Sequence, residues 1–260
     1  MSLGFGTVAR VGHLYPSGGL CDYELQLMAP DGVQFVTTRL PFARTGLADD
    51  RRLLADLEDH ARLVADADVA LVAVNCTAAT MLTGPDVIRR RVREATGLPS
   101  TTTIEAVLAA LRAAGIRRPA LITPYPDDVV AAETAFLAAQ GVDVARHAGI
   151  PCRTPVEQAG IEPSAWLEIA RSLAGRDTPP VDGVLLSCAG VRVAPVIDPI
   201  ERELGVPVVA SNQALLWQVL RTLGVPARPR SHGRLLAGDF DDADPALPIP
   251  ATRRLQWTTR

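Results

Sequence analysis

The chain has 260 residues, of which 48% are hydrophobic and 21% are charged, and its formal net charge at pH 7 is −3. This composition is typical of a globular protein that buries a large core in one domain or in two smaller ones. The net charge and the 4% of aromatic residues provide neither the basic surface nor the stacking platforms that nucleic acids or anionic membranes require. We therefore expect no nucleic-acid partner, no membrane partner and a small molecule as the ligand.

The N-terminal segment "MSLGFGTVARVGHLYP" lacks the cationic start and the continuous apolar core of a signal peptide, and no stretch approaches the roughly 18 apolar residues of a membrane span. We expect a cytoplasmic protein, in which the four cysteines are reduced thiols. Neither these cysteines nor the four histidines show the spacing of metal ligands. No metal site is predicted.

Short runs rich in Val, Leu and Ile alternate along the chain with longer stretches of helical periodicity. The apolar or extended runs cover residues 9–15, 69–75, 98–103 and 119–125, and the helical stretches cover residues 47–67, 85–97 and 104–115. Such alternation predicts an α/β fold, with mostly parallel strands and helices on both faces of the sheet.

The same order of elements returns in the second half of the chain. Cys76 ends one apolar run and is followed by a helix, "GLP", "STTT" and another helix; Cys188 ends a second run, followed by a helix, "GVP", "VVASN" and a helix. These cysteines are 112 residues apart (188 minus 76). We predict two pseudosymmetric halves, with residues 1–110 and 205–236 forming the first and residues 111–204 the second. Residues 237–260 are predicted to be a flexible tail.

Both cysteines fall at the carboxyl ends of predicted strands, where open parallel sheets bind their ligands. A single free cysteine is usually a small buried hydrophobe, and this is our interpretation of Cys21 and Cys152. Two cysteines at equivalent positions, each followed by small residues, instead indicate a pair of catalytic thiols. The small residues, whose backbone N–H groups can approach a ligand, are Thr77, Ala78, Ala189 and Gly190.

Two thiols on opposite faces of a planar intermediate can move a proton from one face to the other. Alternatively, one thiol adds to a double bond and leaves after rotation. Either path develops negative charge at a carboxylate, so hydrogen-bond donors are needed, and donors near the thiols are expected to lower the thiol pKa values. Helix caps and turns are the alternative roles for such polar residues. The candidate substrate-binding residues at strand ends are Thr77, Tyr125, Ser17, Gly18, Ser211 and Asn212.

The segments "REATGLPSTTT", "LITPYPDD", "GVLLSCAG" and "LGVPVVASNQALLW" resemble the aspartate/glutamate racemase superfamily, in the branch of maleate cis-trans isomerases and arylmalonate decarboxylases. The resemblance extends from about Val8 to Leu236. It implies a cofactor-independent enzyme with its active site between two α/β halves. It further implies that Cys76 is the nucleophile, that Cys188 is its acid/base partner, and that Thr77 and Tyr125 hydrogen-bond a substrate carboxylate.

In the decarboxylases of this branch the first cysteine position is typically glycine, so the presence of both thiols favours an isomerase or racemase acting on a small carboxylic or dicarboxylic acid. A decarboxylase and a non-catalytic protein that binds small acids are the alternatives, and homo-oligomerisation is left open. Maleate isomerases carry asparagines where this chain has Gly18 and Gly19 and, further on, Thr154 and Pro155. Without these amide donors, an acid with a bulkier or uncharged second end is a better candidate than maleate.

Overall fold

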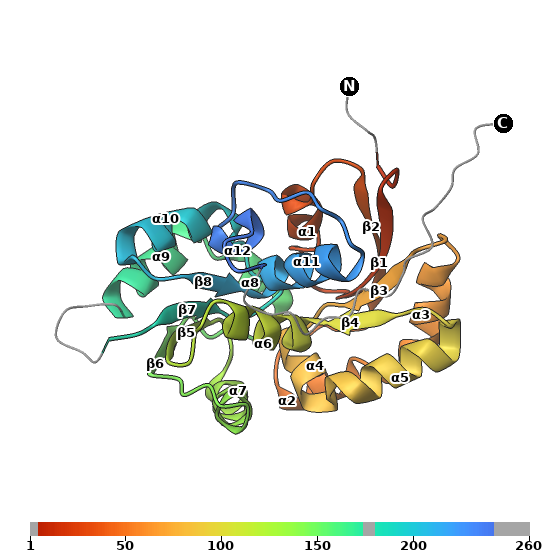
Figure 1. The fold of residues 1–260 in the computed structure, drawn as a ribbon. Coiled ribbons are helices and arrows are strands. Elements are labelled where there is room, and N and C mark those ends of the chain that lie inside the picture. Colours follow the sequence, from red (N-terminus) through yellow and green to blue (C-terminus); the bar gives the residue numbers. More distant parts are fainter. Residues whose placement is uncertain (1–4, 174–179, 242–260) are drawn as a thin grey trace.

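A computed structural model of the protein describes residues 5–173 and 180–241 (Figure 1). The first of its two four-stranded sheets has the order β2-β1-β3-β4, and neighbouring strands are parallel. Its strands are β1 (Ala9–Pro16), β2 (Val33–Leu40), β3 (Leu71–Val74) and β4 (Ser100–Thr102).

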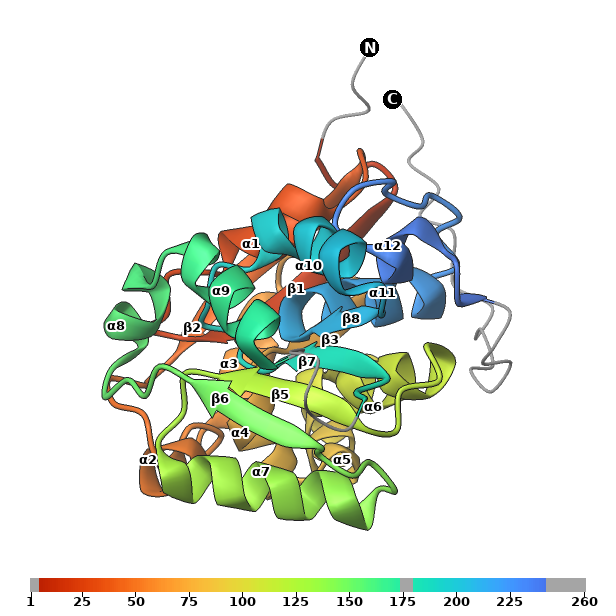
Figure 2. The same ribbon diagram turned by 90° about the vertical axis from the view of Figure 1, so that its left-hand side faces the viewer.

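The second sheet repeats this topology, with the order β6-β5-β7-β8 and parallel neighbours throughout. Helices cover both faces of this sheet, with α7 on one side and α9 and α10 on the other (Figure 2). The predicted α/β fold of two pseudosymmetric halves is therefore confirmed, because the two sheets match strand for strand. The strands of the second sheet are β5 (Pro119–Thr123), β6 (Arg146–Gly149), β7 (Gly183–Leu186) and β8 (Val208–Ala210).

The helices alternate with the strands, as the periodicity predicts. The repeated turns "GLP" and "GVP" end two equivalent helices, because Gly97 and Gly205 adopt left-handed φ values of 72° and 69° that favour glycine. The α-helices are α1 (Tyr23–Met28), α2 (Leu47–Arg52), α3 (Leu57–Ala65), α4 (Thr77–Thr83), α5 (Pro85–Thr96), α6 (Thr103–Ala113), α7 (Asp127–Ala139), α8 (Pro155–Gly160), α9 (Pro163–Leu173), α10 (Ile197–Leu204), α11 (Ser211–Thr222) and α12 (Arg234–Ala237), and Ala194–Val196 form a 3-10 turn.

One hydrophobic core cluster extends through both halves. Helices α6 and α11 pack against each other and are almost entirely buried. The same core cluster contains Val11 and Leu71 of the first sheet and Leu121 and Leu185 of the second. Burial of this continuous apolar surface holds the halves in a fixed relation, which positions a site between them. Among residues 5–173 and 180–241, no helix combines the length and apolar character needed to cross a bilayer.

The structure differs from the sequence-based description in three places. The segment 205–236, assigned to the first half, serves both, because β8 pairs with β7 while α11 contacts β3 and β4. The predicted helix 47–67 is two helices, α2 and α3, separated where Leu53 and Leu54 turn into the core. The edge strands β2 and β6 lie in segments for which no strand was predicted. Of the predicted tail, residues 242–260 lie outside the described residues.

Candidate active site

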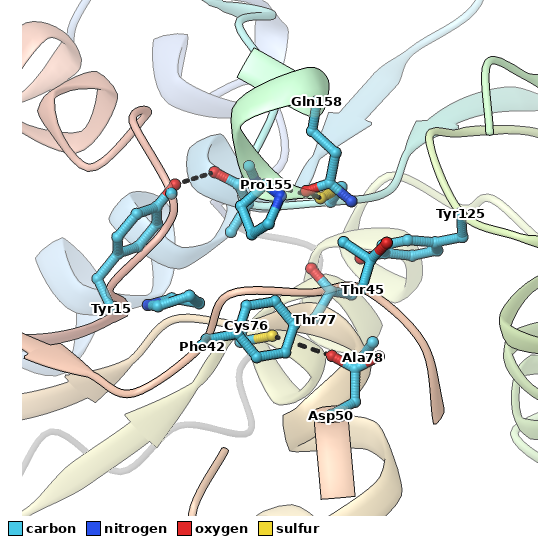
Figure 3. Close-up of a pocket in the computed structure, with 15 residues that line it drawn as sticks. Tyr15, Phe42, Thr45, Asp50, Cys76, Thr77, Ala78, Tyr125, Pro155 and Gln158 are labelled. Atoms are coloured by element: carbon cyan, nitrogen blue, oxygen red, sulfur yellow. Dashed lines mark hydrogen bonds between the residues drawn. The ribbon is translucent and has the colours of Figure 1, made fainter. Parts of the chain in front are cut away.

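A pocket of about 380 Å³, counting the space at its mouth, lies between the two halves at the carboxyl ends of the strands (Figure 3). Residues from both halves line it: Tyr15, Pro16, Gly19, Phe42, Thr45, Asp50, Cys76, Thr77 and Ala78 from the first half, and Tyr125, Pro155, Gln158, Cys188, Ala189 and Gly190 from the second. In the part of the chain that the structure describes, no three His, Cys, Asp or Glu side chains are grouped as metal ligands.

Seven of the predicted site residues line this one pocket. Both cysteines are among them, although they are far apart in the sequence, because β3 and β7 occupy equivalent places in their sheets. The catalytic roles of the thiols remain predictions. The seven residues are Cys76, Thr77, Ala78, Tyr125, Cys188, Ala189 and Gly190.

Ser17 and Gly18, which we predicted to bind substrate, do not line the pocket. The exposed Ser17 hydroxyl accepts a hydrogen bond from the backbone N–H of Phe42 at 2.9 Å, and the Gly18 N–H donates to the Phe42 carbonyl at 2.9 Å. A Cβ at position 18 would come within 2.6 Å of that carbonyl oxygen. The two residues therefore fix the loop that carries Phe42, and Gly19 is the residue of this turn that reaches the pocket.

Asn212 also lies behind the pocket wall. Its fully buried amide group donates to the carbonyl of Ala189 and to the carboxylate of Glu24, both at 3.1 Å, and accepts from the Asn75 amide at 3.0 Å. Because these bonds occupy its polar atoms, Asn212 holds the loop after Cys188 in place instead of facing a ligand.

Cys76 stands immediately before α4 as its N-cap residue, and its thiol points to the carboxylate of Asp50, with Sγ 3.9 Å from Oδ1. Burial raises the pKa of the Cys76 thiol well above its ordinary value, and the negative charge of Asp50 raises it further. The backbone N–H groups of Ala78 and Ala79 lower it by less. Burial also raises the pKa of Asp50 to about 7.

Cys188 has a φ of 155°, which is uncommon for a residue with a side chain. Its Sγ accepts from the Gly190 N–H at 3.1 Å and lies 3.6 Å from the Oε1 of Gln158. Burial raises the pKa of this thiol to about 12, although hydrogen bonds from Gly190 and Tyr125 lower it. The sequence-based expectation of lowered thiol pKa values was wrong, because removing a thiolate from water outweighs these donors. Both thiols are protonated at neutral pH.

Two hydroxyl groups join the halves at the base of the pocket. The Thr77 hydroxyl donates to the Ser211 hydroxyl oxygen at 2.9 Å, and the same oxygen accepts from the Cys188 N–H at 3.1 Å. Burial raises the pKa of the Tyr125 phenol well above its ordinary value, so this side chain stays a hydrogen-bond donor. Ser211 thus positions both Thr77 and the turn of the second thiol.

Several pocket residues were missed by the sequence analysis. Phe42 and Thr45 follow β2, a strand that was not predicted, and Asp50 belongs to an acidic helical stretch that resembles a solvated face. Tyr15 lay within a predicted strand; its hydroxyl donates to the Ala189 carbonyl at 3.1 Å and supports the second loop. Among these pocket residues, the sequence analysis singled out only Pro155, because it stands where maleate isomerases are expected to carry an asparagine.

The chain matches the arylmalonate decarboxylase family over residues 13–236. It is 35% identical over 239 residues to the arylmalonate decarboxylase of Bordetella bronchiseptica, covering 88% of this chain and 94% of that protein. A liganded arylmalonate decarboxylase with one glycine-to-cysteine and one cysteine-to-serine substitution superposes with a TM-score of 0.81 at 31% identity, covering 90% of this chain and 99% of that one.

A second solved relative is a cysteine-to-serine mutant of the maleate cis-trans isomerase of Nocardia farcinica that holds a covalently bound succinylcysteine intermediate. It has a TM-score of 0.81 and 26% identity, and the match covers 91% of this chain and all of that one. The resemblance to the branch that contains both enzymes is thereby confirmed, and covalent chemistry at a cysteine occurs within it. The chain belongs to the arylmalonate decarboxylase family.

Proposed function

We propose that the protein is a cofactor-independent isomerase or racemase that uses Cys76 and Cys188 on a small carboxylic acid. The observation that carries this proposal is that two thiols from equivalent strand ends line one pocket. A decarboxylase needs only one thiol, which protonates the anion left by carbon dioxide. Two thiols are needed when a proton is removed from one face and returned to the other.

In a racemisation, Cys76 reacts as its thiolate: the sulfur takes the proton from the α-carbon, and the electron pair of the broken C–H bond moves toward the carboxylate to form an enediolate. Cys188 then gives its own proton to the opposite face. In a cis-trans isomerisation, the Cys76 thiolate forms a C–S bond with one alkene carbon while the π electron pair moves toward the carboxylate. The remaining C–C single bond rotates, the electron pair returns to re-form the double bond, and the C–S bond breaks. In both reactions the Tyr125 hydroxyl donates to the carboxylate where charge accumulates, and the Thr77 hydroxyl does so once its proton turns from Ser211 to the substrate.

The walls of the pocket favour a substrate whose second end is uncharged. Phe42, Pro16 and Pro155 provide apolar surface, and no lysine or arginine is among the residues lining the pocket. The Asp50 carboxyl also occupies one side, so a second substrate carboxylate would meet either apolar surface or like charge. An α-substituted carboxylic acid with an aryl or alkyl group fits these walls better than maleate does.

Arylmalonate decarboxylation is the second candidate, because the decarboxylase of B. bronchiseptica is 35% identical over most of the chain. Both reactions pass through a carboxylate-stabilised anion that a thiol protonates, so the same pocket serves either of them. The difference lies in whether Cys76 takes part.

The test is a panel of single enantiomers of 2-arylpropionates, maleate and arylmalonates in heavy water, followed by NMR, chiral chromatography and carbon dioxide release. A racemase or isomerase exchanges the α-proton or yields the other isomer, and it loses activity in both Cys76→Ala and Cys188→Ala. An active Cys76→Gly variant that releases carbon dioxide would assign the decarboxylase instead. Ligand binding without turnover, unchanged when both cysteines are replaced, would show a binding protein.

A further inference from the structure

Asp50 is a carboxylic acid in the pocket wall, beside the thiol of Cys76. It is 4% exposed and directly lines the pocket. The thiol of Cys76 donates to its Oδ1 across 3.9 Å (Figure 3). Burying a carboxylate without a cation is costly, which makes a role for this group worth testing.

None of the main electrostatic influences on Asp50 is a positive charge. Burial is the main cause of its raised pKa, the carboxylates of its neighbours raise that pKa further, and the backbone of Gly46 and the Cys76 thiol lower it. An acid with a pKa of about 7 exchanges its proton readily near neutral pH. The groups that interact electrostatically with it are Asp49 in α2, Asp128 in α7, the Cys76 and Cys188 thiols and the Tyr125 phenol.

We propose that Asp50 is the base that removes the proton of the Cys76 thiol, and so generates the thiolate that reacts with the substrate. This inference rests on the proposed function, in which Cys76 is the reacting thiol. The S–H bond of Cys76 breaks, an O–H bond forms at Oδ1 of Asp50, and the negative charge moves from the carboxylate to the sulfur. No other reactant is needed, and the total charge of the pocket does not change.

This proton transfer explains how a buried, protonated thiol can become the thiolate that the reaction requires. Both thiols are protonated at neutral pH, and Cys76 is only 8% exposed, which limits its access to bulk water. A proton acceptor inside the pocket therefore has to be a side chain, and Asp50 is the carboxylate in contact with this sulfur. When the sulfur leaves at the end of an addition and elimination cycle, Asp50 already holds the proton that restores the thiol.

The test measures the alkylation rate of Cys76 by iodoacetamide from pH 6 to pH 8.5, with each cysteine quantified by peptide mass spectrometry. In the native protein, Asp50 and Cys76 share one negative charge once the first proton is lost, because a second anion is opposed by burial and repulsion. The rate at Cys76 then levels above pH 7 and rises less than about fivefold from pH 7 to pH 8.5. In Asp50→Asn the thiol titrates alone, and the rate rises about 30-fold over the same interval.

Asp49→Asn is the matched control, because it removes the adjacent carboxylate, whose partner is Arg52 at 2.9 Å. This variant keeps the levelling near pH 7 and its turnover stays within about twofold of the native rate. Turnover of Asp50→Asn falls about 100-fold at pH 7.5, as loss of a general base commonly causes. If Asp50→Asn does not fold, Asp50→Ser is measured in the same way, with circular dichroism as the check.

An unchanged alkylation profile of Cys76 in the Asp50 variants would overturn the inference. Because alkylation needs no substrate, this result is independent of whether any carboxylic acid is converted. Levelling at Cys76 without turnover of the acid panel would leave the base assignment intact and contradict the proposed function.

Discussion

The two cysteines occupy equivalent positions in a duplicated fold, but their surroundings differ. Helix α4 begins directly after Cys76, whereas Cys188 is followed by a turn in which the Gly190 N–H contacts the sulfur. Each has a buried carboxyl in its vicinity. Asp50 lines the pocket and accepts from Cys76, while Glu133 lies beneath the second loop and accepts from the Ser187 hydroxyl. Of the two equivalent thiols, only Cys76 therefore has a carboxylate in contact with its sulfur.

This difference indicates which thiol donates a proton and which one acts as a nucleophile or base. With a pKa of about 12, Cys188 holds its proton throughout the neutral range and is suited to give it to an anion. Cys76 has a proton acceptor within the same pocket and is suited to become a nucleophile or a base. The duplicated fold places both thiols at equivalent strand ends. Residues that are not repeated, such as Asp50, then make Cys76 suited to lose a proton and Cys188 suited to donate one.

The largest effect is expected from removing either thiol. Cys76→Ala and Cys188→Ala should each lower turnover by a factor of about 1,000 or more, because proton transfer or addition cannot be completed from one face. Each substitution removes only one sulfur atom, so the melting temperature should change little. Chiral chromatography with circular dichroism on the same samples measures both quantities. Retained turnover in both variants would contradict catalysis by the thiols and the different roles assigned to Cys76 and Cys188.

The second largest effect is expected at Tyr125, which brings a donor to the pocket from the end of β5. Tyr125→Phe should lower kcat/KM by about 5- to 150-fold, equivalent to about 1 to 3 kcal/mol for a donor to a developing anion. The phenyl ring keeps its place in the wall, so folding is preserved. If kcat/KM is unchanged, the carboxylate is held elsewhere.

Much of this arrangement was predictable from the sequence, because its signals are local and repeated. The runs ending at Cys76 and Cys188, and the glycine turns at Gly97 and Gly205, mark equivalent elements that any parallel α/β sheet brings to one edge. Asp50 was not predictable, since α2 ends at Arg52 inside the longer helix that was expected, and the packing of α2 against the pocket is a tertiary contact. Propensity and periodicity cannot show such a tertiary effect.

Glu133 provides a contrast with Asp50 that can be measured as stability. Burial raises its pKa from 4.5 to about 7, so the folded protein holds the proton in this interval while the unfolded chain releases it. Stability is then lost as the pH rises through 7, by about 3 kcal/mol at most. Glu133→Gln should match the native protein in urea unfolding at pH 4 and exceed it by about 1 to 3 kcal/mol at pH 8.

Because Glu133 does not line the pocket, turnover of Glu133→Gln should stay within about threefold of the native rate, unlike that of Asp50→Asn. A loss of turnover as large as that of Asp50→Asn would mean that both buried acids take part in the reaction of the thiols. The two halves would then have similar catalytic roles although their contacts differ. Equal stability of Glu133→Gln and the native protein at pH 8 would show that the carboxyl is solvated.

The smallest effect is expected at Ser17, which follows β1 as Tyr125 follows the equivalent strand β5. Ser17 is exposed and its hydroxyl accepts from the backbone of Phe42, so Ser17→Ala should change stability by less than about 0.5 kcal/mol. KM and kcat should remain within about twofold, because the hydroxyl does not reach the pocket and the Gly18 N–H still holds the Phe42 carbonyl. A rise in KM comparable to the effect of Tyr125→Phe would show that the first loop closes over the substrate and that Ser17 binds it, as the sequence had suggested.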